Sequence, residues 1–335
     1  MKLETERLIL RRWKDSDAED LYKYASDPDV GPIAGWPPHQ SIEESRSVIS
    51  NVLNGKEAYA ICLKTDGKAI GAIELKLNGH TDMTERGDEC ELGYWLGKPF
   101  WGQGIMPEAA GEMLRHAFED IGMTKVWCGY YEGNAKSKRV QEKLGFQYQW
   151  TSENLEVAQL QEIRTGYVNR MTKEDWLQLQ DTVCLHTPKV RELWFRERMM
   201  ADSETMSYNH ALGTTIPFPQ EKWESWYSYW IIHHENQRYY RYLVNGMSAF
   251  LGEIAYHYDA EYDGYIADVI LYAPYRNKGY GTKGLKLLCE AAKENGIGTL
   301  LDNIAIDNPA ISLFLKNGFT EAYRTNEIIL LKKDL

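Results

Sequence analysis

Two glycine-rich segments of the chain have the residue types and the setting that phosphate binding requires. They are residues 100–106 (FWGQGIM) and 276–281 (RNKGYG), and each lies between an apolar strand candidate and a long helix candidate. A helix N-terminus presents unpaired N–H groups and the positive end of its dipole, and glycine lets the backbone approach a phosphate closely. The pattern therefore predicts two pyrophosphate-binding loops, although an ordinary strand-to-helix turn can also use glycine.

The second segment continues into residues 279–284 (GYGTKG), which match a literal GxGxxG pattern. A dinucleotide-binding domain would place this pattern after its first strand and follow it with further βα units. Here three or four strand candidates precede the pattern, and only roughly fifty residues follow it. A dinucleotide-binding domain is therefore the less favoured interpretation.

The elements that would position these loops form the same series twice. In the first series we expect strands at residues 7–13, 57–64, 69–77, 90–96 and 124–130, helices at 17–25, 41–54, 106–121, 134–144 and 173–180, and two closing strands before the last helix. In the second series we expect strands at 192–199, 266–272 and 299–306, helices at 219–233, 282–295 and 309–316, a hairpin that turns at Asn245-Gly246, and terminal strands. Helix starts are predicted at Ser16, at Ser41 with Glu44, and at Thr172 with Asp175.

Antiparallel hairpins come first in each series and one βαβ crossover comes later. This order predicts an α+β (mixed α/β) fold in two domains, residues 1–183 and 184–335, each a mixed, mostly antiparallel sheet flanked by helices. The only linker-like segment is His186-Thr187-Pro188, because residues before proline avoid the helical conformation. Without a long Gly/Ser spacer the domains should pack closely, as a pseudo-dimer.

At residues 276–281 the chain resembles the GNAT acetyltransferases, whose acetyl-CoA motif is Arg/Gln-x-x-Gly-x-Gly/Ala. The first domain matches this motif in part, because it keeps Gly104 but has Trp101 and Met106 at the flanking positions. Its wider context resembles the ribosomal-protein N-terminal acetyltransferase branch, as shown by residues 4–11 (ETERLILR), 91–96 (ELGYWL), 100–109 and 171–176 (MTKEDW). The second half of the family motif recurs at residues 134–146 and 307–319, each ending in Gly-Phe.

The resemblance implies an N-acetyltransferase that uses acetyl-CoA as acyl donor and needs no metal. Backbone N–H groups on the strand before each loop could stabilise the oxyanion, and binding along that strand would orient the thioester. The residues that the resemblance places beside the cofactor are Tyr94, Trp95, Leu96, Gly102, Gln103, Gly104, Ile105, Met106 and Asn134 in the first domain, and Ile270, Leu271, Arg276, Asn277, Lys278, Gly279, Tyr280, Gly281, Thr282, Asp307 and Asn308 in the second.

Acetyl transfer to an amine also needs a base for the amine and a proton for the departing thiolate. In the first domain Glu91 is the candidate base, with Glu74 on the preceding strand as an alternative, and either could instead be a solvated strand residue. Ser137 occupies the position where this branch often has a serine that acts on the thiolate. It could equally be a first-turn helix serine.

In the second domain Asp268 is the better candidate base, because an acid inside an apolar strand is costly unless it is paired or functional. Glu253, on the neighbouring strand, is the alternative. Many GNAT enzymes have a tyrosine as general acid where this chain has Phe314. Either Tyr272, Tyr275 or water replaces it, or this domain is catalytically weak.

The formal net charge of −11 argues against non-specific nucleic-acid binding and is compatible with a cationic amine acceptor, such as a small molecule or a peptide N-terminus. No segment is apolar enough for a membrane span or a signal peptide, and the five cysteines lack disulfide or metal spacing. We therefore expect a cytoplasmic protein with no membrane partner. The competing hypothesis is a CoA-binding module in which one or both domains are catalytically silent and serve sensing or assembly.

Overall fold

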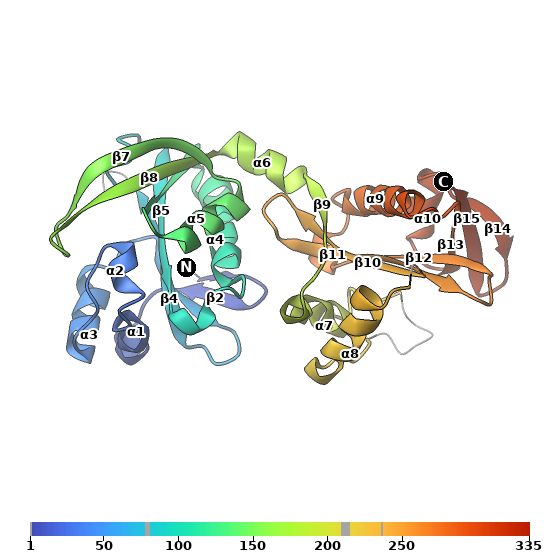
Figure 1. The fold of residues 1–335 in the computed structure, drawn as a ribbon, viewed down its shortest axis with the longest axis horizontal. Coiled ribbons are helices and arrows are strands. Elements are labelled where there is room, and N and C mark those ends of the chain that lie inside the picture. Colours follow the sequence, from blue (N-terminus) through green and yellow to red (C-terminus); the bar gives the residue numbers. More distant parts are fainter. Residues whose placement is uncertain (1, 78–80, 209–214, 236) are drawn as a thin grey trace. The chain divides into compact units, whose positions relative to one another are not determined.

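The structure, a computed structural model, describes residues 2–77, 81–208, 215–235 and 237–335. The chain divides into two compact units, Met1–Gln180 with Gly246–Ser248, and Asp181–Asn245 with Ala249–Leu335. Each unit contains one mostly antiparallel sheet flanked by helices (Figure 1). The predicted mixed α/β fold class is therefore confirmed.

The first unit has an eight-stranded sheet in the order β1-β2-β3-β4-β5-β6-β8-β7. Its strands are β1 (Lys2–Glu4), β2 (Leu8–Arg11), β3 (Ala58–Leu63), β4 (Ala69–Leu77), β5 (Glu89–Leu96), β6 (Lys125–Tyr131), β7 (Gln147–Val157) and β8 (Glu162–Thr172). Its helices are α1 (Ala18–Ala25), α2 (Gly31–Ala34), α3 (Ile42–Asn51), α4 (Ile105–Arg115), α5 (Ala135–Leu144) and α6 (Lys173–Asp181), and α4 continues as a π-helical turn over His116–Ile121. All described neighbours in this sheet are antiparallel except β5 and β6.

The second unit repeats this topology without a counterpart of β1. Its sheet has the order β14-β15-β13-β12-β11-β10-β9. The strands are β9 (Val183–His186), β10 (Arg238–Asn245), β11 (Phe250–Asp259), β12 (Gly264–Leu271), β13 (Thr299–Ala305), β14 (Thr320–Arg324) and β15 (Ile328–Asp334). The helices are α7 (Trp194–Ala201), α8 (Trp223–Tyr227, continued by a π-helical turn over Ser228–Ile232), α9 (Tyr280–Glu294) and α10 (Ile311–Lys316), and β12 and β13 form the parallel pair.

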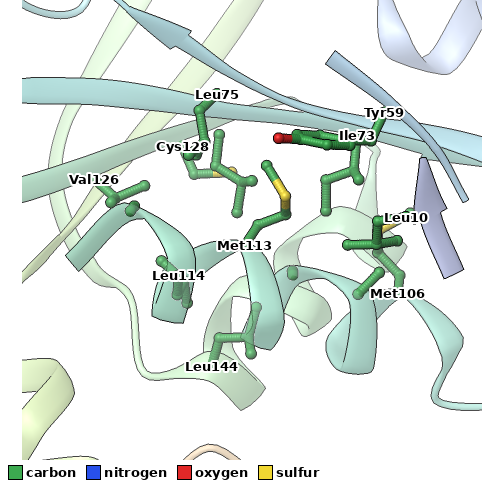
Figure 2. Close-up of a cluster of buried hydrophobic side chains, with 14 of the residues drawn as sticks. Leu10, Tyr59, Ile73, Leu75, Met106, Met113, Leu114, Val126, Cys128 and Leu144 are labelled. Carbon is green, nitrogen blue, oxygen red and sulfur yellow. The ribbon is translucent and has the colours of Figure 1, made fainter. Parts of the chain in front are cut away.

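Apolar side chains cover both faces of each sheet. In the first unit α4 packs on one face, and Figure 2 shows Met113 pointing from α4 toward the strands that carry Tyr59, Ile73 and Cys128. The other face carries α1 and α3 through a smaller apolar cluster. In the second unit α9 and α10 cover one face, and α7 and α8 cover the other. Of the helices described, none is both long and apolar enough to cross a membrane.

Two details of the sequence-based elements are wrong. Residues 192–199 do not form a strand, because this segment lies in a 3-10 turn and in α7, where Phe195 and Met199 are buried one helical turn apart. The first strand of the second unit is instead β9, which pairs with β10. Ser16 does not cap α1, since it lies inside the 3-10 turn Asp15–Asp17 that precedes this helix.

The other two helix starts form as expected. The Oγ of Ser41 accepts a hydrogen bond from the Glu44 N–H at 3.0 Å, although the Glu44 carboxylate accepts from the N–H of Gln40 and not of Ser41. Thr172 and Asp175 cap α6 reciprocally, with side chain-to-backbone distances of 3.1 and 3.2 Å. Both caps satisfy N–H groups that a helix start leaves unpaired.

Candidate active site

The two central strands of the first unit part after a short parallel pairing. The register of β5 with β6 consists of Glu89 with Lys125, Cys90 with Val126, and Glu91 with Trp127. Beyond these pairs, β5 runs on to Leu96 beside β4 alone, and β6 runs on to Tyr131 beside β8 alone, within the described strands. Each strand therefore presents one edge of backbone N–H and C=O groups that a ligand can bind.

The glycine-rich loop joins β5 to α4. Gly102 and Gly104 have positive φ angles of 74° and 77°, a conformation that favours glycine, and Gly104 is the N-cap of α4. Gly102, Gln103 and Gly104 are exposed, whereas the side chains of Ile105 and Met106 are buried in the core. Only the backbone of the last two residues can therefore contribute to an anion site at this helix start.

A hydrogen-bonded group of side chains lies where β5 and β6 part. The hydroxyl oxygens of Tyr94 and Ser137 are 3.0 Å apart, and Gln141 Nε2 donates to Ser137 Oγ at 3.2 Å and to the Gly129 carbonyl at 3.2 Å. Asn169 Nδ2 donates to Gln141 Oε1 at 2.6 Å. Burial raises the pKa of Tyr94 well above its ordinary value, so this phenol stays protonated and can donate.

Asn134 prepares this arrangement from the start of α5. Its side chain accepts a hydrogen bond from the Ser137 N–H at 3.1 Å, as an N-cap does. Ser137 is thus both a first-turn helix residue and a partner of Tyr94, so the two interpretations of this serine are compatible. Sequence reasoning did not identify Gln141, although its position one helical turn after Ser137 places the two on one face of a helix.

The predicted base Glu91 is buried and already has partners. Lys76 Nζ donates to its Oε1 at 2.7 Å and Thr81 Oγ1 donates to its Oε2 at 2.5 Å. Burial lowers the pKa of Lys76, but nearby carboxylates, Glu91 first and then Glu74 and Asp82, more than offset this, so the net shift of this pKa is upward. Glu91 and Lys76 therefore form an ion pair.

Glu74 lies on the same face of the sheet, opposite Gly93 of β5. Because Gly93 has no side chain, the Glu74 Oε1 atom comes within 3.4 Å of the position that a Cβ would take there. Glu74, Gly93, Tyr94 and Trp95 all line a cavity of about 50 Å³. The structure thus brings both candidate carboxylates and the predicted cofactor residues Tyr94, Trp95 and Leu96 together along β5.

A larger hollow of about 470 Å³ opens near the far end of β6. Its lining includes Ile33 of α2, Glu132 after β6, and residues from the β7–β8 hairpin, namely Glu153, Asn154, Ile163, Arg164 and Thr165. Arg164 is engaged elsewhere, since it pairs with Glu162 and donates to the Pro32 carbonyl at 2.6 Å. The carboxylates of Glu132 and Glu153 therefore give the hollow an anionic character.

The second unit repeats the parting of strands. Here β12 and β13 pair only through Tyr265 with Leu300 and Ile266 with Leu301, whereas β12 extends to Leu271 and β13 to Ala305. Gly279, with a φ of 82°, is the N-cap of α9, and Asn277, Lys278 and Gly279 are exposed. The predicted residues Tyr280 and Gly281 are buried, so their backbone alone faces the loop.

Arg276 shapes this loop with its side chain. The guanidinium donates to the carbonyl oxygens of Leu271, Glu204 and Thr205, at 3.3 Å and 2.9 Å for the first two. In the following motif, Asn308 Oδ1 accepts from the Ala310 N–H at 2.9 Å, and Asp307 is exposed. The motif arginine therefore holds the loop by binding the backbone.

The two carboxylates predicted for the second unit differ in access. Glu253 is buried and is bonded to both Arg196 and the Tyr240 hydroxyl. The Asp268 side chain is 46% exposed, and its Oδ2 lies 3.5 Å from His257 Nδ1, which is longer than an ordinary hydrogen bond. This interaction with Asp268 raises the pKa of His257. Asp268 is therefore the more accessible of the two candidate carboxylates.

The candidate proton donors of the second unit are less well placed. Phe314 is buried in the core between α10 and the sheet and has no proton to give. The Tyr272 hydroxyl accepts from Arg198 of α7 at 3.3 Å, and the Tyr275 ring packs beside Tyr272. One acid of this unit was missed by sequence reasoning: Asp302 of β13 is buried inside an apolar strand, the same signal that identified Asp268.

Two family models match the chain, one in each unit. Residues 7–147 match the model described as "Acetyltransferase (GNAT) domain", and residues 198–319 match the one described as "Acetyltransferase (GNAT) family". Among curated proteins, "Uncharacterized N-acetyltransferase p20" of Bacillus licheniformis is 27% identical over 150 residues, which cover 43% of this chain and 82% of that protein. "Putative ribosomal N-acetyltransferase YdaF" of Bacillus subtilis (strain 168) is 37% identical over 94 residues, which cover 28% of this chain and 47% of that protein. Among solved structures, an acetyltransferase (GNAT family) from Bacillus anthracis is 21% identical with a TM-score of 0.46, over 52% of this chain and 99% of that one.

Proposed function

We propose that this chain transfers the acetyl group of acetyl-CoA to a primary amine and that the first unit is catalytic. The basis is that the chain belongs to the GNAT acetyltransferases and carries two of their domains in tandem. The families and relatives indicate N-acetyltransferase activity, and GNAT acetyltransferases use acetyl-CoA. The observation that carries the proposal is the parting of β5 and β6 beside the Tyr94–Ser137 pair.

In this proposal acetyl-CoA lies along the free edge of β5. Its pyrophosphate sits at the N-terminus of α4, against the exposed backbone of Gly102, Gln103 and Gly104. Its pantetheine arm enters between β5 and β6, where no described strand pairs with the backbone groups of Tyr94 to Leu96 on that side. The thioester then lies near the Tyr94 and Ser137 hydroxyls, and backbone N–H groups of β5 polarise its carbonyl.

The two faces of the sheet then have separate tasks in proton transfer. The amine nitrogen attacks the thioester carbon and gives up a proton on the face that carries Glu74 and Glu91, while the thiolate leaves toward Ser137. We propose Glu91 as the base, acting through water. Its carboxylate has about four acceptor sites, of which Lys76 and Thr81 occupy two. Glu74 is the alternative base, and it lines the cavity directly.

We propose the hollow that contains Glu132 and Glu153 as the entry for a cationic acceptor. Two carboxylates beside the end of β6 favour an ammonium group over an anion. The net charge of −11 supports the same class of acceptor. A relative named for ribosomal N-acetylation supports a protein N-terminus as acceptor, and a small amine fits the same charge. The free cysteines support a cytoplasmic location.

Release of CoA thiol across a panel of amines and peptide N-termini tests this function. We expect acceptor-dependent thiol release by the intact chain. Gln103→Glu should weaken acetyl-CoA binding at the first loop roughly tenfold or more by placing an anion beside the pyrophosphate, whereas Gln103→Lys should not weaken it. Both substitutions change an exposed side chain of the same loop, so the comparison isolates charge. No thiol release with any acceptor would contradict the proposal.

A second candidate function applies to the second unit alone. Phe314 replaces a proton donor there, which favours a unit that binds CoA without transferring acetyl. In that case Lys278→Glu would weaken CoA binding to the second loop and leave the rate of acetyl transfer unchanged. A fall in rate for some acceptor would instead identify the second unit as an enzyme.

A further inference from the structure

We propose that Asp302 is the general acid of the second unit and gives its proton to the CoA thiolate when the thioester bond breaks. This inference rests on the proposed function and extends it to the second unit, because it requires acetyl-CoA to bind between β12 and β13. It is the alternative to a second unit that binds CoA without transferring acetyl. It goes further by assigning a role to a side chain that the family motif does not include.

Asp302 occupies the same place in the second unit as Cys128 in the first. Parallel pairing ends at Glu91 with Trp127 in the first unit and at Ile266 with Leu301 in the second. Cys128 and Asp302 are the next residues of their strands, and both side chains are buried. Cys128 interacts with the Tyr94 hydroxyl, which in turn contacts Ser137. The position of Asp302 is therefore the one that adjoins the hydroxyl pair in the first unit.

The second unit has lost the hydroxyl pair itself. Counting from the last strand pair, Tyr94 corresponds to Val269, since each lies three residues beyond it on β5 or β12. Counting back from the Gly-Phe that ends each motif, Ser137 corresponds to Ala310 and Gln141 to Phe314. All three replacements are apolar, so none of them can protonate a thiolate. Asp302 is the acid that remains at this place in the described part of the unit.

The surroundings of Asp302 keep its carboxyl protonated. Asp302 is 9% exposed as a residue and lies between Leu300 and Ile304, which belong to the apolar core under α9 and α10. No hydrogen bond or ion pair to this carboxyl forms within the described ranges. Burial, and then repulsion by Asp268, raise the pKa of Asp302 well above its usual range. A neutral carboxylic acid at neutral pH is a proton donor.

Other titratable side chains belong to this core, among them Tyr256 and Tyr280, and burial raises the pKa of both. Cys289 of α9 is a buried thiol, and burial raises its pKa. Lys333 of β15 donates to the Asn317 carbonyl at 2.8 Å, and it does not contribute to the pKa of Asp302. On the opposite side of the strands, Asp268 faces His257. Asp268 is thus the charged group that acts on Asp302.

Asp268 and Asp302 lie on opposite faces of the sheet. Side chains alternate between the two faces along a strand. On β12, Ala267 packs in the core under α9, whereas Ile270 packs against the core under α7 on the other face. Asp268 shares the face of Ile270, and Asp302 shares the face of Leu300 and the α9 core. The first unit has the same division, with Glu74 and Glu91 on one face and Ser137 with Tyr94 on the other. A base and an acid thus flank the gap between the strands.

The reaction then balances with these two groups. The neutral amine forms a nitrogen–carbon bond with the acetyl carbonyl, and the carbon–sulfur bond breaks with its electron pair on sulfur. The Asp268 carboxylate takes one proton from the amine nitrogen, and Asp302 gives one proton to the sulfur. The products are the amide and CoA thiol, and exchange with solvent returns both carboxyl groups to their starting protonation states.

A binding experiment tests the inference without relying on turnover. The intact chain with Gly104→Glu, which blocks the first loop, would be titrated calorimetrically with acetyl-CoA between pH 6 and pH 9.5. Because the ligand fills the gap and removes water, it should bind best when Asp302 is neutral. Affinity should therefore fall by up to about tenfold per pH unit above the pKa of Asp302. Acetyl-CoA suits this probe because it has no free thiol to titrate.

Two variants in the same background act as controls. Asp302→Asn, which has nearly the same shape, should remove the fall in affinity at high pH. Asp268→Asn removes the repelling charge, so the fall should begin at lower pH. An identical pH profile with Asp302 and with Asp302→Asn would overturn the general-acid assignment while leaving the CoA site in place. Absence of acetyl-CoA binding by the Gly104→Glu chain would overturn the CoA site of the second unit and the acid together.

Discussion

In the reaction proposed for the first unit, the Tyr94 and Ser137 hydroxyls, which lie 3.0 Å apart, protonate the departing thiolate. Ser137→Ala and Tyr94→Phe should each lower kcat roughly 10- to 100-fold, because they remove or misalign the donor. Acetyl-CoA affinity should change little, since neither hydroxyl belongs to the phosphate loop. The two effects should not add, because both residues serve one proton path.

Tyr148→Phe is the matched control for these variants. Its hydroxyl also bonds another hydroxyl, that of Thr151 at 2.9 Å, but Tyr148 is 60% exposed on β7. This variant should keep the parent kcat. Steady-state rates and calorimetric affinities of the single and double variants would be compared. Unchanged kcat in both single variants, or a double effect equal to the sum of the two, would contradict the shared proton path.

Substitution of Glu91 or Glu74 has different expected effects on kcat and on the pH profile, depending on which of the two is the base. Glu91→Gln should lower kcat at neutral pH by about 100-fold or more if Glu91 is the base, and it also deprives Lys76 of its ionic partner. Glu74→Gln keeps that ion pair and changes only the carboxylate at the cavity. The pH profile separates loss of the base from loss of structure, because a missing base removes the acidic limb of kcat/KM. If Glu74→Gln alone abolishes this limb, Glu74 is the base.

Charged hydrogen bonds stabilise the C-terminal end of α4 in the first unit, where Asp120 contacts Arg115 and His116. Asp120 lies in the π-helical turn that follows α4, where Arg115 donates to both of its oxygens at 2.9 Å and His116 Nδ1 lies 2.8 Å away. The hydrogen bonds from Arg115, and then from His116, lower the pKa of Asp120 to about 2. Because its folded pKa lies below its unfolded one, the stabilisation is present above about pH 4 and is lost as the pH falls toward 2.

Asp120→Asn should therefore lower the free energy of unfolding at pH 7 and have less effect at pH 2.5. The Asp120 side chain is 38% exposed, so solvent screening limits the loss to about 1 kcal/mol or less. Urea unfolding at pH 7, 4, 3 and 2.5 measures the difference between variant and parent. Glu119→Gln is the control, because Glu119 is 51% exposed and its contact with Arg115 is long, at 3.4 Å. A difference that stayed constant with pH would refute the role of the Asp120 charge.

Most elements could be predicted from the sequence because their signals are local. The glycine loops and the capping pairs Ser41–Glu44 and Thr172–Asp175 are each contained in a few neighbouring residues. The segment 192–199 was misassigned because Phe195 and Met199 fit either a strand or a helix until their burial is known. The hydrogen bonds of Tyr94, Ser137 and Gln141 join side chains from β5, β8 and α5 to the Gly129 carbonyl of β6, and only the fold brings these together. Pairing of Glu91 with Lys76 likewise depends on sheet register.

At the scale of the whole molecule, each unit has its own sheet, its own parted strands and its own loop. The helix α6 ends at Asp181 and β9 begins at Val183, so the segment between α6 and β9 is very short. β9 pairs with β10 through four residues, Val183, Cys184, Leu185 and His186. Val183 and Leu185 pack against the core of the second unit. A division of the chain that respects the units must therefore leave β9 with the second.

We expect residues 181–335 to fold and bind acetyl-CoA when expressed alone, and residues 190–335 to be less stable. Loss of β9 exposes the side of β10 and the core contacts of Val183 and Leu185, which should lower Tm by roughly 5–10 °C. Within the longer piece, Leu185→Ala should lower Tm, whereas Cys184→Ala should not, because Cys184 is an exposed residue of the same strand. Thermal melting with and without acetyl-CoA measures both effects. Equal melting of the two pieces would show that β9 does not belong to the second core.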